Sequence, residues 1–206
     1  MKVSIVGAGN VGKALASTLA RAGHDVTIAA RHLEHAEEVA RETGAHAATS
    51  VPDTARAADV VILAVPAAAL DEIAAEAGEA LGGKVVVDVT NRPSPDPARP
   101  TSIAEELQEK LPSARVVKAF NTLFAARQAE PLVNGVAADN FIAGDDADAK
   151  QQVISMAEAA GFRPVDAGPL VAARTLEGMA WLNISQNMNG GTWQTTWKLV
   201  EPAEAA

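Results

Sequence analysis

Short apolar runs alternate with segments of helical periodicity along this chain. Residues 2–6 form the first run, which is rich in β-branched side chains and typical of a buried strand. After it, Val11, Leu15 and Leu19 fall four residues apart and predict one apolar face of a helix. Similar strand-like runs recur at residues 26–30, 60–65, 85–89, 115–119, 140–143 and 163–166.

Helix start and stop signals fill the segments between these runs. The first helix is expected to end at about Ala22, with Gly23 as its cap. Further helices are expected to end at Thr43 before Gly44, to span residues 68–81 and 102–111, and to run from a cap at Asp145 or Asp146 to Ala160. Strands that alternate with helices in this way predict an α/β fold with a doubly wound parallel sheet.

Three glycines follow the first strand at the spacing G-x-G-x-x-G, namely Gly7, Gly9 and Gly12. The first permits a tight turn, the second lets the backbone approach a ligand, and the third allows the helix to pack closely on the strand. Such a turn directs backbone N–H groups and the positive helix end at one place, which suits a pyrophosphate. With a strand before it and a helix after it, the turn favours a Rossmann-like dinucleotide site over a glycine-rich turn without a ligand.

The second strand ends at Arg31, about 20 residues past the glycine turn, where this fold often carries an acidic residue that binds the ribose of NAD. A guanidinium instead pairs with phosphate in a planar, charge-assisted geometry. A solvated arginine in a loop is the alternative. Because the acidic residue is missing and the arginine is present, we favour the 2′-phosphate of NADP.

His32 and His35, with glutamates nearby, have a spacing that also occurs in metal sites. The stretch supplies no well-placed third ligand, so it predicts the solvated start of a surface helix rather than a metal site. From that helix, His35 could still reach the 2′-phosphate.

Loops follow five of the expected strands. Ligands of doubly wound sheets lie outside the carboxyl ends of the strands, so we expect these loops to share one rim. The loops are residues 7–12, 31–32, 65–66, 90–91 and 121–122.

From residue 172 onward the pattern changes. An apolar residue recurs every fourth position and predicts a helical stripe: Leu176, Ala180, Ile184 and Met188. Gly190 and Gly191 end this stripe, and Trp193 and Trp197 follow four residues apart. We favour packing over a cofactor-binding surface for these side chains, and two exposed tryptophans would also suit a dimer interface.

The chain has 206 residues, which is enough for one well-buried domain. Its formal charge of -9, from 17 Lys and Arg against 26 Asp and Glu, opposes a nucleic-acid partner and favours a small-molecule coenzyme. The longest apolar run, residues 60–70, contains Pro66 and is too short for a bilayer, and no leader precedes the first strand, so we expect a cytoplasmic protein. The sequence has no Cys and no Tyr, which excludes thiol nucleophiles, cysteine–zinc sites and a Tyr–Lys proton relay.

The glycine turn belongs to a set of motifs that extends over nearly the whole chain. The set comprises residues 7–12, 31, 63–66, 117–122, 144–146, 163–170, 174 and 177. The run DAGPL at residues 166–170 is far more specific than the glycine turn. Together these motifs resemble the NADP oxidoreductases that depend on the deazaflavin coenzyme F420, whose nucleotide fold is also similar to the reductase domain of STEAP ferric reductases.

This resemblance implies an NADP(H)-dependent oxidoreductase that transfers hydride between NADPH and F420 or a flavin. The strand tips and the resemblance together predict a cofactor site made of Gly7, Gly9, Asn10, Val11, Gly12, Ala30, Arg31, His32, His35, Val65, Pro66, Ala69, Asn91, Asn121 and Ala125. The second substrate is expected near Thr175, Gly190 and Gly191. We expect residues 1–170 to bind NADP and residues 171–206 to form a short helical extension, with acceptor and dimer contacts, within one compact homodimer-forming unit.

Hydride transfer between two stacked rings needs little from side chains, because the protein has only to hold the two carbons about 3–3.5 Å apart and exclude water. We therefore assign no catalytic residue and no metal ligand. Asn91 and Asn121 could orient the rings or simply form turns. Imine reductases and β-hydroxyacid dehydrogenases are disfavoured because they need a large helical C-terminal domain. Reduction of a free flavin or a ferric chelate, and a non-catalytic NADP(H) sensor, remain as alternatives.

Overall fold

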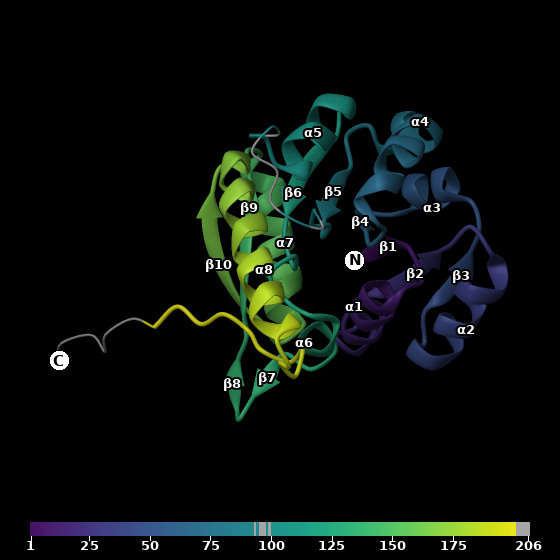
Figure 1. The fold of residues 1–206 in the computed structure, drawn as a ribbon. Coiled ribbons are helices and arrows are strands. Elements are labelled where there is room, and N and C mark those ends of the chain that lie inside the picture. Colours follow the sequence, from purple (N-terminus) through teal and green to yellow (C-terminus); the bar gives the residue numbers. More distant parts are fainter. Residues whose placement is uncertain (93, 95–97, 99, 201–206) are drawn as a thin grey trace.

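The computed structural model describes residues 1–92, 94, 98 and 100–200. Within this part of the chain, an eight-stranded sheet has the order β10-β9-β6-β5-β4-β1-β2-β3 and can be followed in Figure 1 from β10 at the left to β3 at the right. The strands of this sheet are β1 Lys2–Val6, β2 Asp25–Ala29, β3 His46–Ala48, β4 Val60–Leu63, β5 Val85–Asp88, β6 Arg115–Lys118, β9 Asp139–Gly144 and β10 Arg163–Gly168.

Helices cover both faces of the sheet, as a doubly wound fold requires. They are α1 Asn10–Arg21, α2 Leu33–Thr43, α3 Val51–Ala57, α4 Leu70–Leu81 (after the 3-10 turn Ala67–Ala69), α5 Ile103–Lys110, α6 Ala125–Ala129, α7 Ala147–Ala159 and α8 Ala173–Met188 (after the 3-10 turn Leu170–Ala172). Successive residues of β4 show why both faces are covered. Ile62 packs into a core with α1, α2 and α7, whereas Leu63 packs into a second core with α3, α4 and α5.

The order β3-β2-β1-β4-β5-β6 is parallel throughout and is the strand order of a Rossmann fold. The predicted fold class is therefore confirmed, with one correction to the expectation of a wholly parallel sheet. β9 runs antiparallel to β6, and β10 then runs parallel to β9. A parallel connection usually needs a long crossover helix, and the connection from β6 to β9 has none. It contains the five-residue helix α6, which packs beside α1, and then the hairpin of β7 (Leu132–Val133) and β8 (Val136–Ala137).

Local signals placed most helix ends correctly. Gly44 caps α2 in the left-handed conformation, and Asp146 rather than Asp145 caps α7 by accepting a hydrogen bond of 2.7 Å from the Ala149 N–H. The sequence prediction missed α3, a seven-residue helix that Ser50 caps. That segment is too short and too polar to show a helical apolar period.

The C-terminal stripe differs from its prediction. The buried side of α8 consists of Ala173, Leu176, Ala180, Asn183 and Asn187, so the two asparagines replace the expected Ile184 and Met188. Met188 is 64% exposed. The asparagines are buried because the following chain turns back over them, where the Thr195 hydroxyl donates to Asn183 Oδ1 (2.7 Å) and Asn187 Nδ2 donates to the Thr195 Oγ1 (2.8 Å).

Residues 189–200 form a turn followed by irregular chain rather than a helix, so α8 and the preceding 3-10 turn are the helical elements that the structure describes after residue 169. The spacing of Trp193 and Trp197 therefore does not make a helical face. Trp193 packs edge-on against Phe124, with ring centroids 5.2 Å apart, and Trp197 Nε1 donates to the Met179 carbonyl of α8 (3.3 Å). Among the helices of the described residues, none combines the length and apolar character that a bilayer crossing would require.

Candidate nucleotide-binding site

The glycine turn joins β1 to α1 and leaves open space in front of the helix. Gly7 has φ +116°, and a Cβ there would lie 2.2 Å from the Ala64 carbonyl oxygen. A Cβ on Gly12 would lie 1.9 Å from the Gly7 oxygen, so close packing of the chain on itself requires both glycines. A Cβ on Gly9 would meet nothing within 4 Å. The protein itself therefore leaves room at Gly9, as expected where a ligand approaches the backbone.

The N-terminus of α1 is free to bind an anion. Gly9 is its N-cap residue, no side chain caps the helix, and its first turn carries no acidic residue. The first N–H groups of a helix have no partner within the helix, so those of Asn10, Val11 and Gly12 point outward beside the open space at Gly9. A pyrophosphate fits this arrangement of donors and positive helix dipole.

The tips of β5 and β6 bring two predicted site residues together. Asn121 Nδ2 donates to Asn91 Oδ1 (3.0 Å), and Asn91 Nδ2 donates to the Asn121 carbonyl (2.9 Å). Phe120, just before Asn121, is buried and has φ 60°, a left-handed backbone that Asn140 Oδ1 supports by accepting its N–H at 2.8 Å. Strained backbone of this kind is typical of functional loops.

Two buried oxygens at the same strand tip, Asn121 Oδ1 and Thr122 Oγ1, are shielded from solvent. Neither makes a hydrogen bond with the residues that the structure describes. Buried polar atoms are nearly always paired, so these two are suited to bonds with a ligand. The nicotinamide carboxamide, which has two N–H donors, is a chemical match for Asn121 Oδ1.

Arg31 follows the tip of β2, at the position that discriminates NAD from NADP in this fold. Its side chain is mostly exposed, and Nη2 lies 2.7 Å from Glu72 Oε2 of α4. His32 and His35 pack edge to face beside it, with ring centroids 5.6 Å apart. Within the described residues, no cluster of three or more His, Cys, Asp or Glu is arranged to hold a metal.

The remaining predicted cofactor residues lie around the parallel strand tips. Ala30 follows β2, Val65 and Pro66 follow β4, and Ala69 closes the turn after β4 by donating its N–H to the Pro66 carbonyl (2.8 Å). Ala125 is the first residue of α6, four residues after Asn121. The parallel strands therefore bring the predicted cofactor loops to one edge of the sheet.

The residues predicted for the second substrate do not come together. Thr175 lies in the first turn of α8, whereas Gly190 and Gly191 follow its end, and this 16-residue helix is about 24 Å long. Gly191 has a structural reason to be glycine, since a Cβ would lie 2.4 Å from Asn187 Oδ1.

The start of α8 is tied to α5 beside the strand tips. Arg174 binds both carboxylate oxygens of Glu105 (2.8 and 2.7 Å), and these hydrogen bonds lower the pKa of Glu105 to about 2. Glu105 also completes the capping box of Ser102 at the start of α5. Arg174, the neighbour of Thr175, therefore fixes the start of α8 to the start of α5.

A buried charge network under the rim had no assigned role in the sequence prediction. The Lys118 ammonium is fully buried and donates to Asp88 Oδ2 (2.8 Å), Glu177 Oε1 (2.9 Å) and the Thr90 carbonyl (2.7 Å). These bonds use all three N–H donors of the lysine. A signal was present in the sequence, because Asp88 and Lys118 are opposite charges that each end an apolar stretch, Val85–Val87 and Val116–Val117. The structure pairs the two residues in register.

Arg92 extends this network toward the loop after β5. It pairs with Glu106 at 2.6 Å and with Glu177 at 3.3 Å. Glu177 of α8 thus joins Arg92, which follows β5, to Lys118, which ends β6. The network fixes Thr90 and Arg92 on either side of Asn91, and so positions the asparagine pair.

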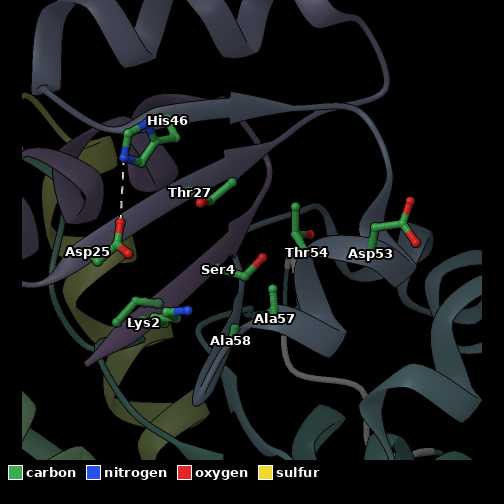
Figure 2. A pocket seen from close by; sticks show the side chains of 10 residues that line it. Lys2, Ser4, Asp25, Thr27, His46, Asp53, Thr54, Ala57 and Ala58 are labelled. Carbon is green, nitrogen blue, oxygen red and sulfur yellow. Dashed lines mark ion pairs between the residues drawn. The ribbon is translucent and has the colours of Figure 1, made fainter.

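A separate pocket of about 390 Å³ lies away from this rim (Figure 2). Its lining includes Lys2 and Asp25, the first residues of β1 and β2, so it faces the ends of the strands opposite to the glycine turn. His46 Nε2 lies 3.6 Å from Asp25 Oδ1 across it, and Asp53 adds a further acid. This pocket is not part of the nucleotide site, and its mixed charges favour no class of ligand.

The strand order, the glycine turn and the uncapped helix N-terminus define a Rossmann dinucleotide-binding protein. The sequence model of the family described as "NADP oxidoreductase coenzyme F420-dependent" matches residues 2–92. An F420-dependent NADP reductase of Methanocaldococcus jannaschii is 32% identical over 213 residues, an alignment that covers 91% of this chain and 93% of that protein. The chain belongs to this F420-dependent NADP reductase family, which confirms the resemblance seen in its motifs.

Other relatives extend the comparison. Metalloreductase STEAP3 of Rattus norvegicus is 34% identical over 182 residues, which are 85% of this chain but 36% of that protein, so the chain spans about a third of its length. A solved structure from Arthrobacter sp. FB24, described as a candidate F420-dependent NADP-reductase, is 29% identical with a TM-score of 0.87 and covers 98% of this chain and 100% of its own. A reductive aminase of Aspergillus terreus, at 23% identity and a TM-score of 0.70 over 92% of this chain and 61% of its own, shares the fold.

Proposed function

We propose that this protein is an NADP(H)-dependent oxidoreductase that transfers hydride between NADPH and F420 or a flavin. One observation carries the proposal: open space at Gly9 lies before an uncapped helix N-terminus, at the strand edge that also carries Arg31. Membership of a family whose full-length relatives are named F420-dependent NADP reductases supports the choice of both coenzymes.

In this proposal the cofactor is held mainly by backbone groups. The N–H groups of Asn10, Val11 and Gly12 bind the pyrophosphate, and Arg31 binds the 2′-phosphate, with His32 and His35 beside it. Ala30, Val65, Pro66, Ala69 and Ala125 form the apolar walls of the groove, as their places around the strand tips suggest.

The asparagine pair orients the nicotinamide in this proposal. Asn121 Oδ1 accepts a hydrogen bond from the carboxamide, because it is buried and has no partner among the described residues. Asn91 holds Asn121 in place, and the Lys118 network holds the loop that carries Asn91. The asparagines are therefore positioning groups rather than turn formers alone.

When bound, NADPH supplies a hydride and the deazaflavin or flavin ring accepts it. The protein orients the two rings and excludes water, and no side chain acts as acid or base. Thr175 at the start of α8 lines the acceptor site, whereas Gly190 and Gly191 lie beyond the other end of α8 and are not assigned to it.

We also propose two functional regions, a homodimeric assembly and a cytoplasmic location for this protein. Residues 1–170 bind NADP, and residues 171–206 supply acceptor and dimer contacts within one compact unit, working as a homodimer in the cytoplasm. Half-exposed apolar side chains on α8 and the tail, Leu182, Met188 and Trp193, support the dimer. Sedimentation velocity tests the homodimer, and cell fractionation tests the cytoplasmic location. A monomer at all protein concentrations would contradict the proposed homodimer.

Absorbance assays of NADPH oxidation against F420, FMN, FAD, a quinone and a ferric chelate test the function. We expect turnover with F420 or a flavin. The similarity to STEAP3 makes flavin-mediated ferric reduction the second candidate, which would show as ferric turnover that requires added flavin. Tight NADPH binding without turnover of any acceptor would favour a sensor and contradict the proposal.

The replacement Gly9→Ala is expected to weaken NADPH binding roughly tenfold, because the new methyl group occupies space that the pyrophosphate needs. The backbone at Gly9 has φ -80°, so alanine fits the free protein without strain. Calorimetric titration measures the affinity. Gly178→Ala in α8, where a Cβ also meets nothing within 4 Å, is the matched control and should bind normally. Normal binding by Gly9→Ala would mean that the phosphates lie elsewhere.

A further inference from the structure

Arg31 is already engaged by a carboxylate of its own chain. Glu72 lies in the first turn of α4, the helix that follows β4, and its Oε2 is 2.7 Å from Arg31 Nη2. The side chains of Arg31 and Glu72 are 71% and 63% exposed, so solvent and ligands can reach both groups. The pair thus joins the tip of β2 to α4 across the place where the adenosine ribose is expected.

An acid at this place is unusual for a site that selects a phosphate. In dinucleotide-binding folds the tip of β2 carries either an acid for the ribose hydroxyls of NAD or an arginine for the 2′-phosphate of NADP. This chain supplies the arginine from β2 and an acid from a different element. A carboxylate on the guanidinium uses the same donors that a phosphate would use.

We propose that Glu72 is a specificity-determining residue that lowers the preference for NADP(H) over NAD(H) by competing with the 2′-phosphate for Arg31. This inference rests on the proposed function of Arg31. Binding of NADP(H) must displace the carboxylate from at least one guanidinium donor and leaves two anions close together. NAD(H) has no phosphate at this position, so its binding neither displaces the carboxylate nor brings two anions together.

The size of the effect follows from the exposure of the pair. A surface ion pair is weak, and two charges about 4 Å apart in water interact modestly, so the competition should lower NADPH affinity about threefold to tenfold. The phosphate, with more charge and more acceptor oxygens than a carboxylate, still displaces Glu72. Glu72 therefore tunes selectivity without abolishing it.

The test compares Kd values of NADPH and NADH for the intact protein and for Glu72→Gln. We expect Kd for NADPH to fall about threefold to tenfold and Kd for NADH to change less than twofold. The NADPH gain should shrink at high salt, since salt screens exposed charges. Glu76→Gln, the same change one turn further along the exposed side of α4, is the matched control and should leave both Kd values unchanged.

A double variant separates this inference from the function on which it rests. In Arg31→Ala, the further change Glu72→Gln should bring little gain, because its partner is gone. An unchanged NADPH Kd in Glu72→Gln, or an equal gain for NADH, would overturn the role of Glu72 even if Arg31→Ala impairs NADPH alone. If Arg31→Ala impairs both cofactors equally, the proposed phosphate recognition fails instead. Thermal melting of each variant confirms that it is folded.

Discussion

Lys118→Met is expected to lower the free energy of unfolding by about 3–5 kcal/mol, because it removes the cation paired with the buried Asp88 carboxylate and leaves Glu177 with Arg92 alone. Asp88 is fully buried against the ammonium, and Glu177 is nearly so. Methionine approximates the length of the lysine but supplies no charge and no N–H donor. Chemical denaturation, followed by circular dichroism, measures the loss.

Lys110→Met is the matched control. It removes an ion pair with Asp71 whose two side chains are 43% and 76% exposed, so the cost should stay below about 1 kcal/mol. Similar losses for the two variants would show that the buried network does not depend on its charge. If Lys118→Met is folded at low temperature, its NADPH affinity should also fall, because the loop of Asn91 is no longer held.

Arg31→Ala is expected to weaken NADPH binding about tenfold to a hundredfold, the range for hydrogen bonds to a charged group. NADH binding should change little, since it has no 2′-phosphate. Arg31→Lys should recover part of the NADPH affinity, because it keeps the charge but loses the planar fork. Titrations of both cofactors measure the effect.

Arg41→Ala, in the last turn of α2, changes the same charge on an exposed position and should bind both cofactors normally. It controls for the net charge of the protein. Equal weakening of NADPH and NADH by Arg31→Ala would remove the argument for 2′-phosphate recognition, whatever the acceptor turns out to be.

The parts of the fold that the sequence predicted depend on neighbours in the chain. The run at residues 60–65 predicts a buried parallel strand because all its side chains are apolar, and β4 is buried on both faces. The glycine turn could be located for the same reason, because Gly7 has φ +116° and a Cβ on Gly12 would meet the Gly7 oxygen five residues away. Arg31 could be assigned because in this fold the residue that contacts the ribose lies at the end of the second strand, about 20 residues past the glycine turn.

The C-terminal region shows where this reasoning stops. A four-residue period placed Ile184 and Met188 inside, yet Asn183 and Asn187 are buried because residues 189–200 return over α8. A residue distant in the sequence also holds residues 189–200 in place, because buried Asp139 accepts hydrogen bonds from Lys198 and the Leu199 N–H. No local pattern contains that information.

The sequence by itself determined five of the six parallel strands (β3 was not predicted), the glycine turn and the arginine at the tip of β2, because periodicity and turn chemistry act over a few residues. The tertiary structure alone decided three other features: the reversal of β9, the burial of Lys118 between Asp88 and Glu177, and the contact of Glu72 with Arg31. Each of these joins residues tens of positions apart, and their energies depend on burial and distance, which arise only when the chain is packed.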